Sequence, residues 1–197
     1  MLWTIQNKQV LQTIQQTGRY YPDFRQSGYL KEIPALGPLY MQILRAMNRL
    51  NFIATDETHG NGVVFCFAGM DCENGAPLDD LDSFLTFINA HQNAVASLWK
   101  HLVADPDNIL LQVDFYPDFF NPMLIDINDF QFLMPPVIVG SPFTYKDVNE
   151  ILDSLAAGKF HQSAMPSNVI QAHLPYIDQA NLVNAYTANS IINPNRN

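Results

Sequence analysis

Residues 108–140 carry the sequence NILLQVDFYPDFFNPMLIDINDFQFLMPPVIVG, which decides how we expect this chain to fold. Three apolar runs lie within it, at residues 109–113, 123–127 and 130–139, and Pro and Asn separate them. The Val, Ile and Phe content favours strands, and the prolines exclude one long helix. We therefore predict two or three core strands here, with helices from either side of the stretch packing against them.

Upstream of this stretch, the sequence predicts a strand, a helix and a second strand. Residues 2–6 have the alternation of a short strand, and Asn7 is suited to cap a helix over residues 8–17. Gly18 is suited to end that helix in the left-handed conformation. Residues 63–68, VVFCFA, predict a buried strand because Val and Phe dominate them.

The spacing of apolar residues predicts the helices of the fold. They cover residues 39–50, 77–103 with a break near 89–93, 145–157, 166–174 and 175–186. Pro77 is suited to the first position of its helix. These segments predict an α/β or α+β fold, with a mixed or antiparallel sheet of about five strands covered by helices. We expect a single domain over residues 1–190 and a frayed tail at 191–197.

The composition limits the class of protein. The 197 residues are 48% hydrophobic and 15% charged, which suits a folded core rather than a disordered chain. The net charge of -9, without a Lys/Arg cluster, disfavours nucleic acid as a partner. Neither a membrane span nor a signal peptide is predicted, and the two cysteines suit a reducing compartment. We expect a soluble, cytoplasmic protein, or an effector secreted without a cleavable signal.

One loop contains residues that are able to support catalysis. Asp56, Glu57 and His59 lie within four positions of one another. A carboxylate beside an imidazole can orient it as a general base or help to hold a metal. A solvated polar turn has the same composition, so both interpretations of this loop stay open.

Three further carboxylates are candidates. Asp114 directly follows the apolar run 109–113, where it is either a catalytic carboxylate at a strand end or an acceptor of turn hydrogen bonds. Asp71 and Glu73 lie in the loop DCENG, whose start is similar to that of a calcium loop, although the closing Glu is absent. No sequence signature for a metal or phosphate site is present, so the sequence leaves the cofactor and the catalytic activity open.

The segment after Gly18 is rich in aromatic residues. It contains Tyr20, Tyr21, Phe24 and Tyr29. Such rings either cover the edge of the core or form a surface that binds a ligand or a protein partner.

Some motifs resemble those of a known family. L-W-T-I-Q at residues 2–6, Gly18-Arg19-Tyr20, and I-L-L-Q-V-D-F at residues 109–115 followed by Asn121 resemble one family of small bacterial proteins. That family is named only as a domain of unknown function. The resemblance implies a strand at the start of the chain and another near the middle, and it assigns no activity and no functional residue.

We therefore expect a non-enzymatic interaction protein, such as an accessory factor or effector, with the aromatic segment as its partner site. One alternative is a small enzyme that acts on a nucleotide-like polar ligand through the loop at residues 56–59. The other is a metal-supported binding module that uses Asp71 and Glu73. A concave pocket with an acid–histidine hydrogen bond would favour the enzyme.

Overall fold

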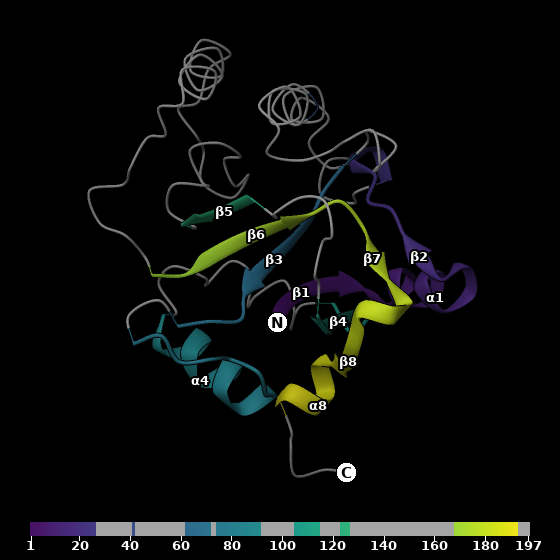
Figure 1. The fold of residues 1–197 in the computed structure, drawn as a ribbon. Coiled ribbons are helices and arrows are strands. Elements are labelled where there is room, and N and C mark those ends of the chain that lie inside the picture. Colours follow the sequence, from purple (N-terminus) through teal and green to yellow (C-terminus); the bar gives the residue numbers. More distant parts are fainter. Residues whose placement is uncertain are drawn as a thin grey trace, which may run out of the picture.

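The computed structural model describes residues 1–26, 41, 62–71, 74–91, 105–114, 123–126 and 168–192. These parts form an α+β fold with a large sheet, a small sheet and helices (Figure 1). The strands are β1 (Leu2–Asn7), β2 (Arg19–Tyr20), β3 (Val64–Ala68), β4 (Asn108–Val113), β5 (Met123–Asp126), β6 (Ile170–Leu174), β7 (Ile177–Asp178) and β8 (Leu182–Thr187). The α-helices are α1 (Lys8–Thr17), α4 (Leu81–Ala90) and α8 (Ala188–Ile192), and two 3-10 turns are η1 (Phe24–Gln26) and η2 (Gln179–Asn181).

The large sheet has six strands in the order β5-β6-β3-β1-β4-β8, and each neighbouring pair is antiparallel. β1 lies inside the sheet, where Leu2 pairs with Ala68 of β3 on one side and with Val113 of β4 on the other. β4 and β5 confirm the strands predicted at residues 109–113 and 123–127. The small sheet contains only β2 and β7.

The sheet separates two hydrophobic clusters, because alternate residues of a strand point to opposite faces. The α4-side cluster, to which α8 also contributes, consists of Trp3, Phe67, Leu78, Phe84, Phe87, Ile88, Leu110, Val169 and Ile191. The α1-side cluster consists of Leu2, Val10, Ile14, Val64, Cys66, Ile109, Leu111, Val113, Ala172, Leu174 and Ile177. Each face of the sheet is therefore covered by its own helix.

Local sequence explains why α1 has these ends. Asn7 Oδ1 accepts a hydrogen bond from the backbone N–H of Gln9 at 3.0 Å, which caps the first turn. Gly18 has a φ of 81° and donates its N–H to the carbonyl of Ile14 at 2.8 Å. The predicted cap, helix and stop are confirmed, and the turn at Gly18 directs the chain into β2.

The two helices predicted at residues 166–174 and 175–186 are wrong. The chain there forms β6, β7, η2 and β8. In β6 the side chains alternate with period two, so that Ala172 and Leu174 point into the α1-side cluster while Gln171 and His173 are buried on the other face. The apolar–polar alternation of IQAHL is present in the sequence, although over five residues only.

Two predicted boundaries also move. α4 begins at Leu81 rather than at Pro77, because Asp80 caps it and Pro77 forms an isolated bridge with Met70. α8 continues to Ile192 and buries Ile191, so the predicted frayed tail loses its first two residues to a helix. Apart from residue 41, the predicted helix at 39–50 lies outside the described residues, as do the helix at 145–157 and the run at 130–139.

Candidate functional site

Part of the predicted site falls outside the described residues. Asp114, Asp71, Tyr20, Tyr21 and Phe24 are described. The described ranges do not include Asp56, Glu57, His59, Glu73 or Tyr29. The loop proposed for an enzyme and half of the proposed calcium loop therefore stay predictions from the sequence.

Asp71 and Asp114 lie at the same end of the sheet, because β3 and β4 both end beside the start of β1. Two strand spacings, roughly 10 Å, separate the ends of β3 and β4. Asp71 takes part in a tight turn, in which its N–H donates to Ala76 and its carbonyl accepts from Gly75, each at 2.8 Å. Asp71 and Asp114 therefore follow strands that end on the same side of the sheet.

Asp114 joins β4 to the turn before β8. Its backbone N–H donates to the carbonyl of Asn181 at 2.8 Å, and the side-chain amide of Asn181 donates back to the Asp114 carbonyl at 2.8 Å. Its Oδ1 is buried and accepts no hydrogen bond from the described residues. The strand-end argument for a catalytic Asp114 comes from parallel sheets, and this sheet is antiparallel, so that argument no longer applies.

Two rings of the predicted aromatic segment cover the core. Tyr20 packs against the α1-side cluster, and burial raises the pKa of its hydroxyl, with a smaller contribution from Asp23. Phe24 is buried and stacks on Phe65, with the ring centroids 6.0 Å apart. For these two residues, the interpretation as a cover over the core edge is the one that the geometry supports.

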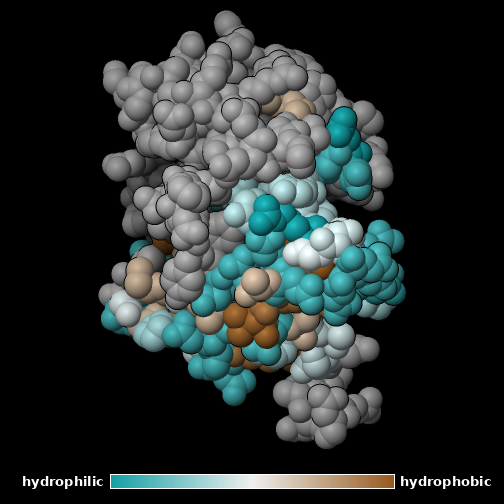
Figure 2. Space-filling model, turned by 45° about the vertical axis from the view of Figure 1, so that its right-hand side comes forward, coloured by the Kyte–Doolittle hydropathy of each residue, from teal (hydrophilic) through white to brown (hydrophobic). Residues whose placement is uncertain are grey.

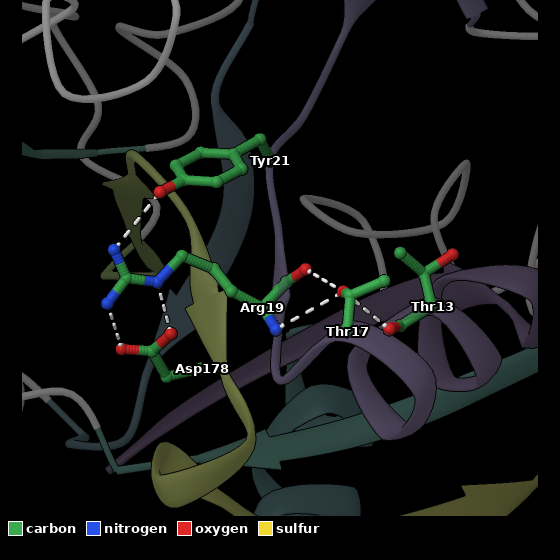
Figure 3. A network of polar contacts seen from close by, with 5 residues as sticks. All are labelled: Thr13, Thr17, Arg19, Tyr21 and Asp178. Carbon is green, nitrogen blue, oxygen red and sulfur yellow. Dashed lines mark hydrogen bonds and ion pairs between the residues drawn. The ribbon is translucent and has the colours of Figure 1, made fainter.

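Tyr21 instead takes part in a polar network that joins β2 to β7 (Figure 3). Arg19 Nε and Nη2 donate to the two carboxylate oxygens of Asp178, the second at 2.7 Å. Arg19 Nη1 donates to the Tyr21 hydroxyl at 3.1 Å. The guanidinium also lies over the ring of Tyr176, 4.1 Å from its centroid. We refer to Arg19, Tyr21, Tyr176 and Asp178 as the Arg19 corner.

The electrostatics of the Arg19 corner keep the guanidinium charged and fixed. The hydrogen bond to Asp178 raises the pKa of Arg19 further above its already high value, and the bond to Tyr21 adds to this. A two-oxygen Arg–carboxylate pair fixes the plane of the guanidinium, and a cation over a tyrosine ring contributes about 0.5–1 kcal/mol. The Arg19 side chain is still 40% exposed, so this ordered group remains accessible from solvent.

The backbone around Gly18 places Arg19 in this corner. β2 and β7 pair Arg19 with Asp178 and Tyr20 with Ile177, and the Gly18 carbonyl accepts the N–H of Gln179 at 2.8 Å. The Thr17 hydroxyl lies 2.7 Å from the Arg19 carbonyl oxygen, which holds the turn after α1. Sequence reasoning missed Tyr176 and Asp178, because 159 positions separate Arg19 from Asp178 and no local pattern links them.

Two chemically reactive residue types lie inside the protein rather than at a site. Cys66 is buried in β3, and burial raises the pKa of its thiol to about 12. A thiol that stays protonated is a poor nucleophile, so Cys66 behaves as a small buried hydrophobic residue. His173 is fully buried in β6, and burial lowers the pKa of its imidazole to about 3.

Other kinds of site have little support among the described residues. In the described ranges, no three His, Cys, Asp or Glu side chains converge as metal ligands would. Of the helices that the structure describes, none has the length and apolar character needed to cross a membrane.

No protein-family model, no curated protein and no solved structure matches this chain. The Arg19 corner is therefore the best-defined candidate site.

Proposed function

We propose that the protein is a non-enzymatic interaction protein that binds a protein partner through the Arg19 corner. The observation that carries this proposal is the ordered, partly exposed Arg19 guanidinium between the rings of Tyr21 and Tyr176. Tyr and Arg are the residue types that most often dominate binding energy in protein interfaces. An accessory or effector role is compatible with such a surface.

Preorganisation strengthens the argument. An arginine that must be immobilised on binding loses about 0.5–1.5 kcal/mol of side-chain freedom. In the Arg19 corner, Asp178 and Tyr21 already fix the guanidinium. The rings of Tyr21 and Tyr176 meet edge to face with centroids 6.1 Å apart, so they form a firm surface rather than mobile side chains.

A photo-crosslinking experiment tests the proposal. A benzoylphenylalanine replaces Tyr21 in one variant and the exposed α1 residue Gln16 in a control variant. We expect a discrete crosslinked protein from position 21 in the source cell and none from position 16. If both positions give the same products, or position 21 gives none, the proposal is wrong.

Affinity for the purified crosslinked partner provides the second measurement. We expect Tyr176→Ala to weaken binding by about 10-fold or more, as truncation of an interface hot spot does. Gln16→Ala is the matched control and should change the affinity by less than about twofold. Circular dichroism must show that both variants are folded. An unchanged affinity in a folded Tyr176→Ala variant would contradict a role for this corner.

A further inference from the structure

β8 is an edge strand of the large sheet. It pairs with β4 on one side, and in the described parts of the chain nothing pairs with its other side. Three consecutive residues, Val183 to Ala185, are exposed, and Val183 is 46% exposed. Figure 2 brings the side of the molecule with β7 and β8 forward and shows a compact hydrophobic area among hydrophilic atoms.

The sequence of β8 does not protect this edge. Proteins usually block an edge strand with charged residues or proline, and LVNAYT contains neither. The pairing with β4 does shift register between Gln112 and Val113, which leaves Val183 at a bulge. From Asn184 to Thr187 the pairing with β4 is regular. The N–H and C=O groups that point away from β4 are therefore spaced to pair with a further strand.

Three acidic residues neighbour β8, two of them through their backbone carbonyls and one, Asp80, through its charge. Gln112 connects the strand to the approach to α4, since its side-chain oxygen accepts from Asn184 Nδ2 at 2.7 Å and its Nε2 donates to the Asp79 carbonyl at 2.5 Å. Burial raises the pKa of the Tyr186 hydroxyl, and the negative charge of nearby Asp80 raises it further. At the other end of β8, just before the strand begins, Asn181 Nδ2 donates to the backbone carbonyl of Asp114.

No described cation neutralises these carboxylates. The cationic side chains of the described parts all lie in ion pairs with other acids: Lys8–Asp107, Arg19–Asp178 and Arg25–Asp23. The whole chain carries a net charge of -9. The negative charge of Asp80 beside Tyr186 therefore favours a positively charged partner strand.

We infer that β8 binds an extended, lysine- or arginine-rich segment of another protein, which adds to the sheet as a further strand. Backbone hydrogen bonds along β8 provide the affinity, and the negative charge of Asp80 beside Tyr186 selects for positive charge. A second copy of this chain fits less well, because its β8 would bring the same negative charge. This site is separate from the Arg19 corner and does not depend on it.

Hydrogen exchange with a defined probe tests the inference. The probe is a capped eight-residue peptide of alternating valine and lysine, and the matched control peptide has glutamate in place of lysine. We expect the lysine peptide to slow exchange of the outward backbone amides of β8 by about fivefold or more, and the glutamate peptide to have no effect. A fully N-methylated lysine peptide, which keeps the charge but lacks backbone donors, should also have no effect.

Paired variants at Ala185, which is exposed in β8, separate charge from packing. We expect Ala185→Lys to weaken binding of the lysine peptide by about fivefold and Ala185→Glu to leave it equal or tighter, since both add a long side chain. Tyr176→Ala changes the Arg19 corner and should not alter peptide binding to β8. A failure of the β8 inference can therefore be told apart from a failure of the proposed function.

Three results would overturn the inference. They are the absence of β8 protection at millimolar lysine peptide, equal protection by the glutamate peptide, and protection without peptide in a protein that sediments as a dimer. The last result would make β8 an interface between copies of this chain.

Discussion

His173 is the buried ionisable residue whose environment has the clearest consequence. It pairs with Phe65 across β3 and β6, and the two rings meet edge to face with centroids 5.3 Å apart. Its Nε2 lies 3.3 Å from Gln171 Oε1. Burial lowers the pKa of the imidazole from 6.5 to about 3, so the folded protein keeps this ring neutral.

The stability of the protein should therefore fall as pH falls below 6.5. Between pH 6.5 and 3 the unfolded chain binds a proton at His173 that the folded chain does not, so the free energy of unfolding decreases by up to about 1.4 kcal/mol per pH unit. Urea unfolding at pH 7, 6 and 5 measures this slope. In the His173→Gln variant, the free energy of unfolding should depend less steeply on pH, by the uptake of about one proton. An equal slope in both proteins would show that His173 is not responsible.

At the scale of single elements, two glycines differ in why a larger residue would destabilise the protein. At Gly69 the side chain would clash, and at Gly75 it would strain the backbone. Gly69 donates its N–H to the Met1 carbonyl at 2.9 Å, and a Cβ on it would lie 2.4 Å from that same oxygen. Gly75 has a φ of +69°, and nothing lies within 4 Å of the Cβ position. An alanine at residue 69 must displace the backbone of the first residue of the chain, whereas an alanine at residue 75 meets only local strain.

We expect Gly69→Ala to lower the free energy of unfolding by about 3 kcal/mol and Gly75→Ala to lower it by about 1 kcal/mol. The larger effect comes from a clash that moves Met1 away from β3. Chemical denaturation of the two variants and the parent protein measures both values. A Gly69→Ala variant no less stable than Gly75→Ala would mean that the chain start adjusts without loss.

The elements that the sequence predicted correctly are those whose signals are local. α1 carries its cap, its apolar spacing and its stop within residues 7–18. β6 was mistaken for a helix because what makes it a strand is its pairing with β3, about a hundred residues earlier. The Arg19 corner was missed for the same reason, since Asp178 reaches Arg19 only through the pairing of β2 with β7.

At the scale of the whole molecule, β4 joins the two hydrophobic clusters. Leu110 lies in the α4-side cluster and Leu111 in the α1-side cluster, and both are fully buried. The sequence predicted this run as part of the central stretch from its Val, Ile and Phe content. Burial on both faces agrees with its nearly continuous apolar sequence. The strand order could not be predicted, because partners far apart in sequence fix it.

Because adjacent residues of one strand belong to both clusters, we expect the described fold to unfold as one cooperative unit. Leu110→Ala and Leu111→Ala should each lower the free energy of unfolding by about 2–5 kcal/mol. Trp3 reports on the α4 side, where its ring stacks on Phe84 at 4.6 Å and its Nε1 donates to the Leu78 carbonyl at 2.7 Å.

Fluorescence in a Trp99→Phe background isolates Trp3, and far-UV circular dichroism follows the backbone as a whole. If the clusters are coupled through β4, Leu111→Ala must shift the Trp3 midpoint as far as the backbone midpoint, although Leu111 faces α1. Leu110→Ala is the matched control on the Trp3 side. Should Trp3 keep the parent midpoint while the dichroism midpoint of Leu111→Ala falls, the two faces would unfold separately, and the sheet would not transmit the loss of packing from one face to the other.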